Sequence, residues 1–402
     1  MKEDFDIIVV GAGPCGSFSA LQAARQGAKV AVIEEHQKIG EPNHCAGHIS
    51  IRGLKTLGLE LPSAVIENRI RAAKFYAPSG KIICIDCKHP VTYVVNRTSF
   101  DQHLAGLAEE AGATYLNQVH ADSFLIDSNH VQGVLVRGRE RARLEARIVI
   151  DAEGASAGLL RKTPLPIPSS ATYVTGAQGH SAKVRDLDDE SVEIYLGRDY
   201  APGFFAWIIP RHDGTAKVGL ATNKGNPRVL LDNFAEKHPI ASKKIAGPLS
   251  DISFHPIPLS GPPSTTYGNG LLVVGDAASQ VKPITGGGVV FGLTCSNIAG
   301  RVAAEAVRAG NCSSRFLSMY QRLWREELGR EFWIGRRARW IMDRLSDRAI
   351  DRVFSIGDAF DVGDSLGQVG EIDFAGKVLG SSLRKPNVAF AFLCSLFSCL
   401  LP

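Results

Sequence analysis

Six residues near the start of the chain have the spacing of a phosphate-binding turn. The apolar run Asp6–Val10 leads directly into the GxGxxG segment 11–16, and a helix-like stretch follows. In such a turn Gly11 allows the tight bend, Gly13 lets the backbone approach a pyrophosphate, and Gly16 lets the helix pack closely on the strand. The amide groups at the helix start then face the phosphates.

A second β-rich run, Lys29–Ile33, ends at an acidic residue, Glu34. Glu34 lies 18 residues after Gly16, which is the place for an acid that accepts hydrogen bonds from a ribose. Strand, turn, helix, strand and acid therefore occur in the order of a dinucleotide site. This pattern alone does not separate FAD from NAD, because both carry a pyrophosphate and an adenosine ribose.

A second glycine-rich motif lies about 260 residues further on, after the apolar run Leu271–Val274. An aspartate at a strand end can accept from a ribityl hydroxyl, and a triple glycine at a helix start leaves N–H groups facing a phosphate or a flavin ring. Two phosphate motifs so far apart suit one long cofactor, which favours FAD. The residues of this second motif are Gly275, Asp276, Pro283, Gly286, Gly287, Gly288 and Val289.

Between the two motifs, a third strand-like run ends in Asp151 and leads to Gly154. With these three motifs in this order, the chain resembles the p-hydroxybenzoate hydroxylase-like FAD superfamily over nearly all of residues 1–310. Arg97, between a strand-like run and a helix-like segment, is similar to the family arginine that contacts FAD. The alternative is a solvated arginine at a helix start. The resemblance also implies that Glu35 contributes to the cofactor site.

The resemblance implies an α/β fold, in which a GxGxxG-type, Rossmann-like FAD-binding domain is interrupted by a β-rich substrate domain and followed by a helical C-terminal region. Alternating strand patterns at Ser191–Leu196 and Phe204–Ile209 agree with a β-rich insertion. The expected ranges are 1–70, 96–165 and 263–310 for the FAD domain, 71–95 and 166–262 for the substrate domain, and 311–402 for the C-terminal region.

Hydroxylases, halogenases and reductases share this scaffold, so the substrate domain must indicate the reaction. Phe205, Trp207 and Ile209 alternate along one predicted strand that ends at Pro210, and Gly219 follows a few residues later. On one face of a strand these side chains form an apolar wall suited to a long hydrocarbon, or else an ordinary sheet core.

This segment resembles the tyrosine-x-tryptophan-x-phenylalanine-proline element of the geranylgeranyl reductase family, which carries a Gly-x-Gly after a similar gap. The chain departs from that pattern at three positions, with Phe205 for tyrosine, Ile209 for phenylalanine and Ala221 for glycine. The departures keep apolar bulk but remove a phenol, so the resemblance implies the pocket and not a hydroxyl role.

A second segment, Pro42–Gly47, matches the Pro-x-x-Cys-x-Gly element of the same reductases, and hydroxylases lack its cysteine, here Cys45. The resemblance implies that Cys45 and Ala46 lie at the cofactor and that Cys45 and His44 are the nearest candidates for a proton donor. Bound water or the flavin itself are the alternatives. Halogenases are a rival, since their tryptophan-x-tryptophan-x-isoleucine-proline element resembles Phe205–Pro210 about as well.

The resemblance to the reductases implies saturation of isolated C=C bonds in geranylgeranyl chains, on geranylgeranyl diphosphate or on a membrane ether lipid, by hydride from flavin N5 together with a proton. No second dinucleotide fold is evident, so electrons would come from NADPH, ferredoxin or another reduced carrier. A flavin monooxygenase or halogenase, and a non-catalytic lipid carrier, stay open as alternatives.

Composition adds limits on partners and location. The net charge of +4, over 45 basic and 41 acidic residues, gives no general field for nucleic acid, and no metal site is expected. Scattered cysteines and no basic leader favour the cytoplasm. Residues 321–354 carry nine arginines with aromatic residues at near-helical spacing, which fits lipid head groups or packing on the protein itself. The apolar tail Val388–Leu401 is too short to span a bilayer, but could anchor the protein peripherally at the inner membrane face or cover a substrate tunnel.

Overall fold

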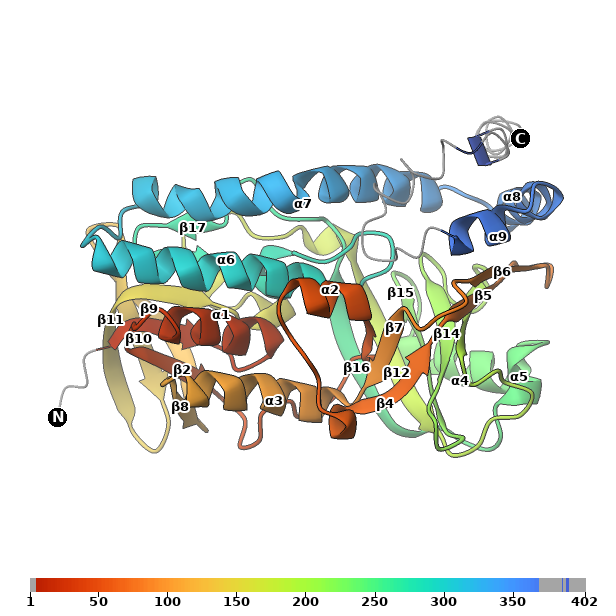
Figure 1. Cartoon of the computed structure of the whole chain (residues 1–402), viewed down its shortest axis with the longest axis horizontal. Helices are drawn as coiled ribbons and strands as arrows, with labels where there is room; N and C mark the ends of the chain where they lie inside the picture. Colours follow the sequence, from red (N-terminus) through yellow and green to blue (C-terminus); the bar gives the residue numbers. More distant parts are fainter. Residues whose placement is uncertain (1–4, 369–384, 386–387, 390–402) are drawn as a thin grey trace. The chain divides into compact units, whose positions relative to one another are not determined.

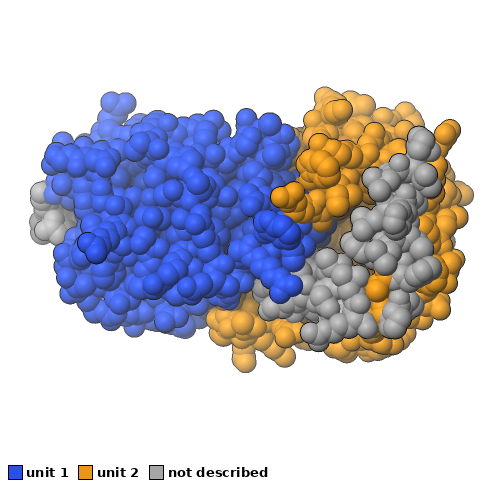
Figure 2. Space-filling view, turned by 90° about the horizontal axis from the view of Figure 1, so that it is seen from above, with its two compact units in different colours: residues 1–43, 97–173, 257–336 blue, residues 44–96, 174–256, 337–402 orange. Residues whose placement is uncertain are grey.

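The computed structural model describes residues 5–368, 385 and 388–389, and the chain divides into two compact units (Figure 2). Unit 1 comprises Met1–Asn43, Arg97–Tyr173 and Ile257–Arg336, and unit 2 comprises His44–Asn96, Val174–Pro256 and Arg337–Pro402. Each unit is therefore assembled from three separate stretches of the chain.

Apart from small shifts at residues 96, 166–173 and 257–262, these units differ from the expected ranges in two places. Residues 44–70, expected in the FAD-binding domain, group with unit 2, because strands β3 (His48–Ser50) and β4 (Ile66–Ile70) both pair with β7 (Thr92–Val95). The expected C-terminal region is shared between the units, and the division falls within one long helix.

Unit 1 is built on a mixed sheet with the path β17-β18-β11-β1-β2-β8, to which β10 and β9 add through β11. The strands β18, β11, β1, β2 and β8 run parallel. Such strands are covered on both faces, which explains the nearly continuous apolar runs of β1 and β2. The bounds are β1 (Phe5–Val10), β2 (Val30–Glu34), β8 (Thr114–Asn117), β9 (His120–Asp127), β10 (His130–Arg137), β11 (Arg141–Asp151), β17 (Tyr267–Gly268) and β18 (Leu271–Val273).

Three helices of unit 1 lie side by side along this sheet, with α1 (Pro14–Ala24) between α3 (Arg97–Glu110) and α6 (Val289–Arg308) (Figure 1). Helix α7 (Ser314–Met342) packs on α6 through the rings of Phe291 and Phe332, whose centroids are 5.2 Å apart. Short 3-10 turns follow the strands at η2 (Gly154–Ser156), η3 (Leu160–Lys162), η4 (Ser170–Thr172) and η5 (Gly275–Ala278).

In the part of the chain that the structure describes, unit 2 contains a seven-stranded sheet, in the order β16-β12-β15-β14-β13-β5-β6, and a three-stranded sheet, β3-β7-β4. One face of the larger sheet packs on α4 (Pro227–Lys237) through Leu231 and Phe234. The remaining strand bounds are β5 (Ala72–Tyr76), β6 (Ile82–Asp86), β12 (Tyr173–Ser181), β13 (Ser191–Leu196), β14 (Phe205–Pro210), β15 (Ala216–Thr222) and β16 (Ser250–Pro258).

Short helices complete unit 2. Helices α8 (Asp347–Ala359) and α9 (Val362–Gly367) contact β6, so they cover a sheet edge whose strand would otherwise expose unpaired backbone groups. The others are α2 (Ile51–Thr56), η1 (Ser63–Val65) and α5 (Ala241–Lys244). The predicted α/β class, the Rossmann-like sheet and the C-terminal helices are confirmed. The predicted apolar tail lies, apart from residues 388 and 389, outside the described residues.

Candidate functional site

The predicted cofactor motifs of unit 1 meet at one edge of its parallel sheet. Strand β1 runs into Gly11, β11 ends at Asp151, β18 runs into Gly275, and β2 ends at Glu34. In the register of the sheet, Val10 lies beside Asp151 and Ile33, and Asp151 lies beside Val273. The carboxyl ends of these four neighbouring strands therefore bring together motifs that are spread over some 260 residues of sequence.

The GxGxxG turn has the close packing that the sequence predicts. A Cβ on Gly16 would collide with the carbonyl oxygen of Gly11, so no larger residue fits where α1 meets β1. Gly13 is the N-cap of α1 and provides no side-chain cap, and a Cβ on Gly13 would meet no atom within 4 Å. The start of α1 therefore has free space beside Gly13, as the approach of a pyrophosphate requires.

Glu34 has a structural role that sequence reasoning missed. Its Oε2 accepts a hydrogen bond from the backbone N–H of Ala12 at 2.9 Å, and its Oε1 accepts from the backbone N–H of His36 at 2.9 Å. Glu34 therefore fixes the GxGxxG turn from the neighbouring strand, in addition to the predicted contact with a ribose. The Glu35 carboxylate pairs with the His120 ring at 2.8 Å and is 55% exposed.

The late motif forms a compact loop in front of α6. The backbone N–H of Gly286 donates to the carbonyl of Lys282 at 2.9 Å, and Pro283 packs under Gly335 of α7. Gly288 is the N-cap of α6 without a side-chain cap, and a Cβ on Gly288 would lie only 3.0 Å from Oδ1 of Asp276.

The Asp276 carboxylate and the start of α6 at Val289 are therefore adjacent. The second triple-glycine position, Gly287, lies against the Lys282 side chain.

The central acid Asp151 is fully buried at the end of β11. Its Oδ1 accepts from the backbone N–H of Glu153 at 3.1 Å, whereas its Oδ2 has no hydrogen-bond partner among the described residues. Burial, together with the charge of Glu153, raises the pKa of Asp151 well above its ordinary value. Beyond it, Gly154 has φ +80° and faces open space.

Arg97 lies at a helix start, but its side chain is largely buried, so the alternative of a solvated arginine does not hold. It is the first residue of α3, its side chain is 13% exposed, and its guanidinium makes a two-point contact of 3.1 Å with Asp101. Burial raises the pKa of the Cys15 thiol in the GxGxxG turn to about 12, with Asp276 raising it further and Arg97 lowering it. Arg97 and Asp276 thus lie within electrostatic range of the same turn.

These features fit FAD. The N-termini of α1 and α6, which follow Gly13 and Gly288, have no side-chain caps, and such uncapped ends leave backbone amides that suit a pyrophosphate or a flavin. A Cβ on Gly13 would meet no atom within 4 Å, and the buried Oδ2 of Asp151 has no hydrogen-bond partner among the described residues. A dinucleotide site needs both features, namely room beside a glycine and an acid that can accept a hydrogen bond. When bound there, FAD would be held by these amides and by the side chains of Glu34 and Asp276.

In unit 2 the predicted apolar element lies on one face of the large sheet. The Trp207 indole lies flat across Gly219 of the adjacent strand, where an added Cβ would come within 2.5 Å of the ring. The indole Nε1 then reaches Oε1 of Gln178 on the next strand, at 3.1 Å. Gly219 is therefore needed for the tryptophan to cross β15.

The rest of this element is also placed as the strand alternation predicts. Phe205, Trp207 and Ile209 share a face of β14, with Trp207 and Ile209 buried and Phe205 half-buried. The Phe205 ring stacks on Phe204, with centroids 4.2 Å apart. Pro210 is buried at the strand end, and its carbonyl accepts from the side chain of Asn68 at 3.0 Å.

The predicted cysteine segment contacts this same face, within unit 2. Nε2 of Gln178 donates to the carbonyl oxygen of Cys45 at 3.4 Å, and the Cys45 Sγ accepts from the backbone N–H of Gly47 at 3.4 Å. The His44 ring stacks on His255, with centroids 4.8 Å apart. Ala46, which follows Cys45, is half-buried. Two motifs about 160 residues apart therefore meet at Gln178.

Sequence reasoning missed Gln178 and the buried Lys217. Both lie on the Trp207 face, since Gly219 pairs with Gln178 and Trp207, and Lys217 precedes Gly219 by two residues. Two polar residues at alternate positions of β12, Gln178 and His180, and a lysine inside the apolar β15 are the signals that the sequence offers. They become informative only when the strand order is known.

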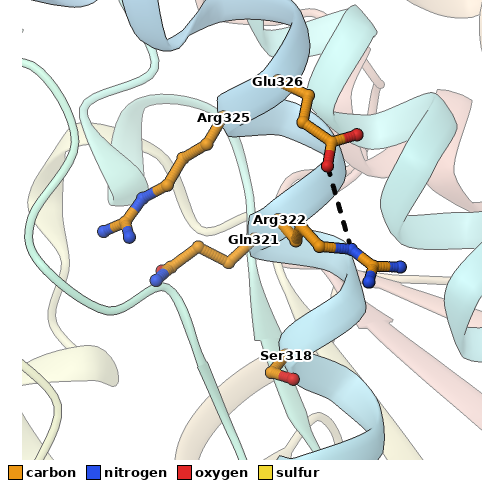
Figure 3. A pocket seen from close by; sticks show the side chains of 5 residues that line it. All are labelled: Ser318, Gln321, Arg322, Arg325 and Glu326. Atoms are coloured by element: carbon orange, nitrogen blue, oxygen red, sulfur yellow. Dashed lines mark ion pairs between the residues drawn. The ribbon is translucent and has the colours of Figure 1, made fainter.

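A shallow surface pocket lies along α7 in unit 1 and contains none of the predicted site residues (Figure 3). Arg322 and Glu326 form an exposed ion pair of 3.9 Å beside it, and Arg325 donates to the carbonyl of Ser264. These side chains serve helix packing. The residues that line the pocket are Ser318, Gln321, Arg322, Arg325 and Glu326.

The arginine-rich segment 321–354 lies in two helices, α7 and α8, in agreement with its near-helical spacing. In α7, Trp324 and Phe332 pack inside the protein, whereas Trp333 and Trp340 are 56% and 57% exposed. Among the described residues no helix combines the length and the apolar character needed to cross a bilayer.

Comparison with known proteins agrees with this geometry. Residues 4–322 match the FAD binding domain family. Digeranylgeranylglycerophospholipid reductase 2 of Methanopyrus kandleri is 36% identical over 396 residues, which cover 96% of this chain and 98% of that protein. Digeranylgeranylglycerophospholipid reductase of Methanocaldococcus jannaschii is 32% identical over 372 residues, which cover 90% of this chain and 93% of that protein.

Two solved structures have folds similar to that of this chain. A geranylgeranyl bacteriochlorophyll reductase-like protein of Thermoplasma acidophilum has a TM-score of 0.86 at 27% identity, and the match covers 98% of this chain and 99% of that one. The myxobacterial chondrochloren halogenase CndH has a TM-score of 0.69 at 18% identity over 98% and 97% of the two chains, a likeness of fold alone.

The cofactor is FAD, and the chain belongs to the FAD-binding family of digeranylgeranylglycerophospholipid reductases, which are oxidoreductases that act on CH–CH groups.

Proposed function

We propose that this protein saturates the isolated C=C bonds of geranylgeranyl chains carried by a glycerophospholipid. The observation that carries the proposal is the link through Gln178, which joins Trp207 of the apolar element to Cys45 of the cysteine segment. These are the two motifs on which the resemblance to prenyl reductases rests. The names of the relatives that match over nearly the full chain support the same substrate class.

In this proposal unit 1 holds the cofactor and unit 2 holds the hydrocarbon. Reduced FAD supplies a hydride equivalent to one carbon of the double bond. In unit 1, the proposed cofactor contacts are the glycines of the two phosphate motifs, the carboxylates of Glu34, Asp151 and Asp276, and the Arg97 guanidinium. In unit 2, the face of β14 with Phe205, Trp207 and Ile209 binds the prenyl chain and excludes water from it.

Each reduction also needs a proton on the second alkene carbon. An isolated trisubstituted alkene is electron-rich and resists hydride alone, so a general acid must act first or together with hydride transfer. We propose that Cys45 lies in the active site and donates this proton, with His44 as the second candidate. The half-buried thiol is held by the Gly47 amide, which orients its sulfur.

Two electrons and two protons are consumed for each double bond, and the electrons come from outside the chain. We propose an external reductant, either a nicotinamide or a reduced electron carrier such as ferredoxin. Because the substrate is a membrane lipid in this proposal, we also propose peripheral contact with the inner face of the membrane. The exposed Trp340, on which the Arg344 guanidinium stacks at 3.9 Å, is suited to a lipid head-group region.

The deciding experiment is anaerobic incubation of the dithionite-reduced protein with digeranylgeranylglycerophospholipid and, separately, with geranylgeranyl diphosphate. Mass spectrometry should find a gain of two hydrogens for each double bond in the phospholipid. No gain with either substrate, in protein that retains reduced FAD, would reject the reductase and leave the monooxygenase or halogenase alternative, which oxygen uptake would then detect.

A further inference from the structure

Lys217 is a lysine with 0% exposure, on the same face of β15 as Gly219. His180 of β12 lies directly opposite it on one side, and Ile209 of β14 lies opposite on the other. Lysine is almost never fully buried unless its charge is paired, so this position requires an explanation.

The ammonium of Lys217 makes two strong contacts. It donates to the carbonyl oxygen of Val95 at 2.8 Å and pairs with Oε2 of Glu67 at 2.7 Å. The backbone N–H of Val95 in turn donates to the carbonyl of Gly47 at 2.8 Å. Lys217 therefore holds the end of β7, and the end of β7 holds Gly47.

Gly47 completes a short chain of contacts to the thiol. Its backbone N–H donates to Cys45 Sγ at 3.4 Å. Its φ is +70°, and a Cβ there would lie within 3.1 Å of the Lys217 Nζ and still closer to the Val95 carbonyl. The turn is thus packed directly against the lysine, and the sulfur takes its orientation from this turn.

Around Lys217 there are more positively charged side chains than negatively charged ones. Arg211 approaches the same Glu67 carboxylate at 3.5 Å and contacts His180 at 2.7 Å, so two cations share one anion. Burial lowers the pKa of Lys217, whereas Glu67 and, less strongly, Cys45 raise it. The lysine charge therefore lies within electrostatic range of the Cys45 sulfur.

Packing does not account for this arrangement. A buried ion pair contributes little net stability compared with apolar side chains of the same volume. The same unit has a second buried pair, Lys244 with Glu193, on the sheet face that packs on α4. That pair provides a matched reference, because it has the same chemistry and lies in the other face of the sheet.

We propose that Lys217 is a positioning residue for the Cys45 thiol, because its ammonium fixes the Gly47 turn, whose N–H donates to the sulfur. The inference rests on the proposed function, in which Cys45 acts in the active site. It adds a residue that touches neither the reacting atoms nor the cofactor and acts through Val95 and Gly47.

The test compares Lys217→Met with Lys244→Met in the full-length, FAD-loaded protein. Carboxamidomethylation of Cys45 by iodoacetamide is followed by mass spectrometry at pH 8, with the exposed Cys84 as the internal reference. Without the ammonium the Gly47 turn loses its anchor, and its N–H no longer holds the Cys45 sulfur in place, so Lys217→Met should slow Cys45 alkylation about fivefold relative to Cys84. The kcat for the prenyl phospholipid should fall with an unchanged KM, and Lys244→Met should alter neither quantity.

An unchanged Cys45 rate in folded Lys217→Met would overturn the proposal, as would the same slowing in Lys244→Met. Should Lys217→Met fail to fold, the double variant Lys217→Met/Glu67→Gln removes both members of the buried pair while Arg211 keeps its contact with His180, and the same slowing is required of it. Alkylation does not depend on turnover. A wild-type protein that reduces no prenyl chain would therefore reject the proposed function while this comparison still decides the role of Lys217.

Discussion

The indole Nε1 of Trp207 donates to Oε1 of Gln178 across the intervening strand β15, at 3.1 Å. Since the amide nitrogen of the same Gln178 faces the Cys45 carbonyl, one glutamine couples the apolar wall to the cysteine segment. The orientation of the tryptophan and the position of the cysteine are therefore linked.

This link predicts a specific effect of Trp207→Phe. Phenylalanine keeps an aromatic ring over Gly219 but removes the donor, so Gln178 loses one of its two anchors. We expect turnover of the prenyl phospholipid to fall about tenfold with FAD content unchanged. Trp324→Phe is the matched control, because Trp324 donates to Thr266 at the same 3.1 Å in unit 1. An equal loss of turnover in the control would contradict the prediction.

Gly219→Ala tests the close approach of the indole to β15. The added methyl would enter the space of the Trp207 ring, so the ring must move and its bond to Gln178 must break. We expect the free energy of unfolding to fall by about 1–3 kcal/mol, measured by urea denaturation. Gly106→Ala in α3, where a Cβ meets nothing within 4 Å, should stabilise the protein instead.

Glu34→Gln tests the acid at the end of β2. The amide oxygen can still accept from Ala12, but the charge that favours ribose hydroxyl donors is lost. We expect the dissociation constant of FAD to rise about tenfold, measured by fluorescence titration of the apoprotein. The neighbouring Glu35→Gln disturbs only an exposed pair with His120 and should leave the affinity unchanged. Equal affinities of the two variants would remove Glu34 from the cofactor site.

Cys45→Ala separates cofactor binding from chemistry. If Cys45 supplies the proton, the variant should retain FAD and lose turnover about a hundredfold or more. Cys84→Ala, at an exposed position of β6, should behave as wild type. Full turnover in Cys45→Ala would exclude this thiol as the acid and favour His44, water or the flavin.

Tyr195 predicts how stability depends on alkaline pH. Burial and the Glu193 carboxylate raise the pKa of Tyr195 above its ordinary value of 10.0. The folded protein thus keeps a proton that the unfolded chain releases. The stability from this shift is complete below pH 10 and is lost as the pH rises above it. Denaturation midpoints from pH 8 to 11 should fall less steeply for Tyr195→Phe than for wild type or Tyr267→Phe.

The elements that carry the cofactor motifs could be predicted because their signals are local. The apolar run before Gly11 corresponds to β1, and the helix expected after the triple glycine is α6, which begins at Val289. Burial on both faces of a parallel sheet makes each strand continuously apolar, and short glycine spacings mark each turn. The place of Arg97 at the start of α3 also follows from its position between a strand-like and a helix-like segment, whereas its contact with FAD stays a prediction.

The unit boundaries and the polar partners could not be predicted in the same way. Residues 44–70 join unit 2 through strand pairing with β7, which no local pattern reveals. Gln178 and Lys217 gain meaning only from the order β12-β15-β14, which places them beside Trp207 and Cys45. Long-range pairing depends on the free energy of the whole sheet, so a single sequence leaves it open.

The interleaved construction of the two units limits how this protein can change over evolutionary time. Because the chain passes from unit 1 to unit 2 and back repeatedly, neither unit corresponds to one continuous stretch of gene. Recombination that swaps a single segment would replace fragments of both. A change confined to one face of a unit 2 sheet is therefore reached more directly by point substitution than by exchange of a segment.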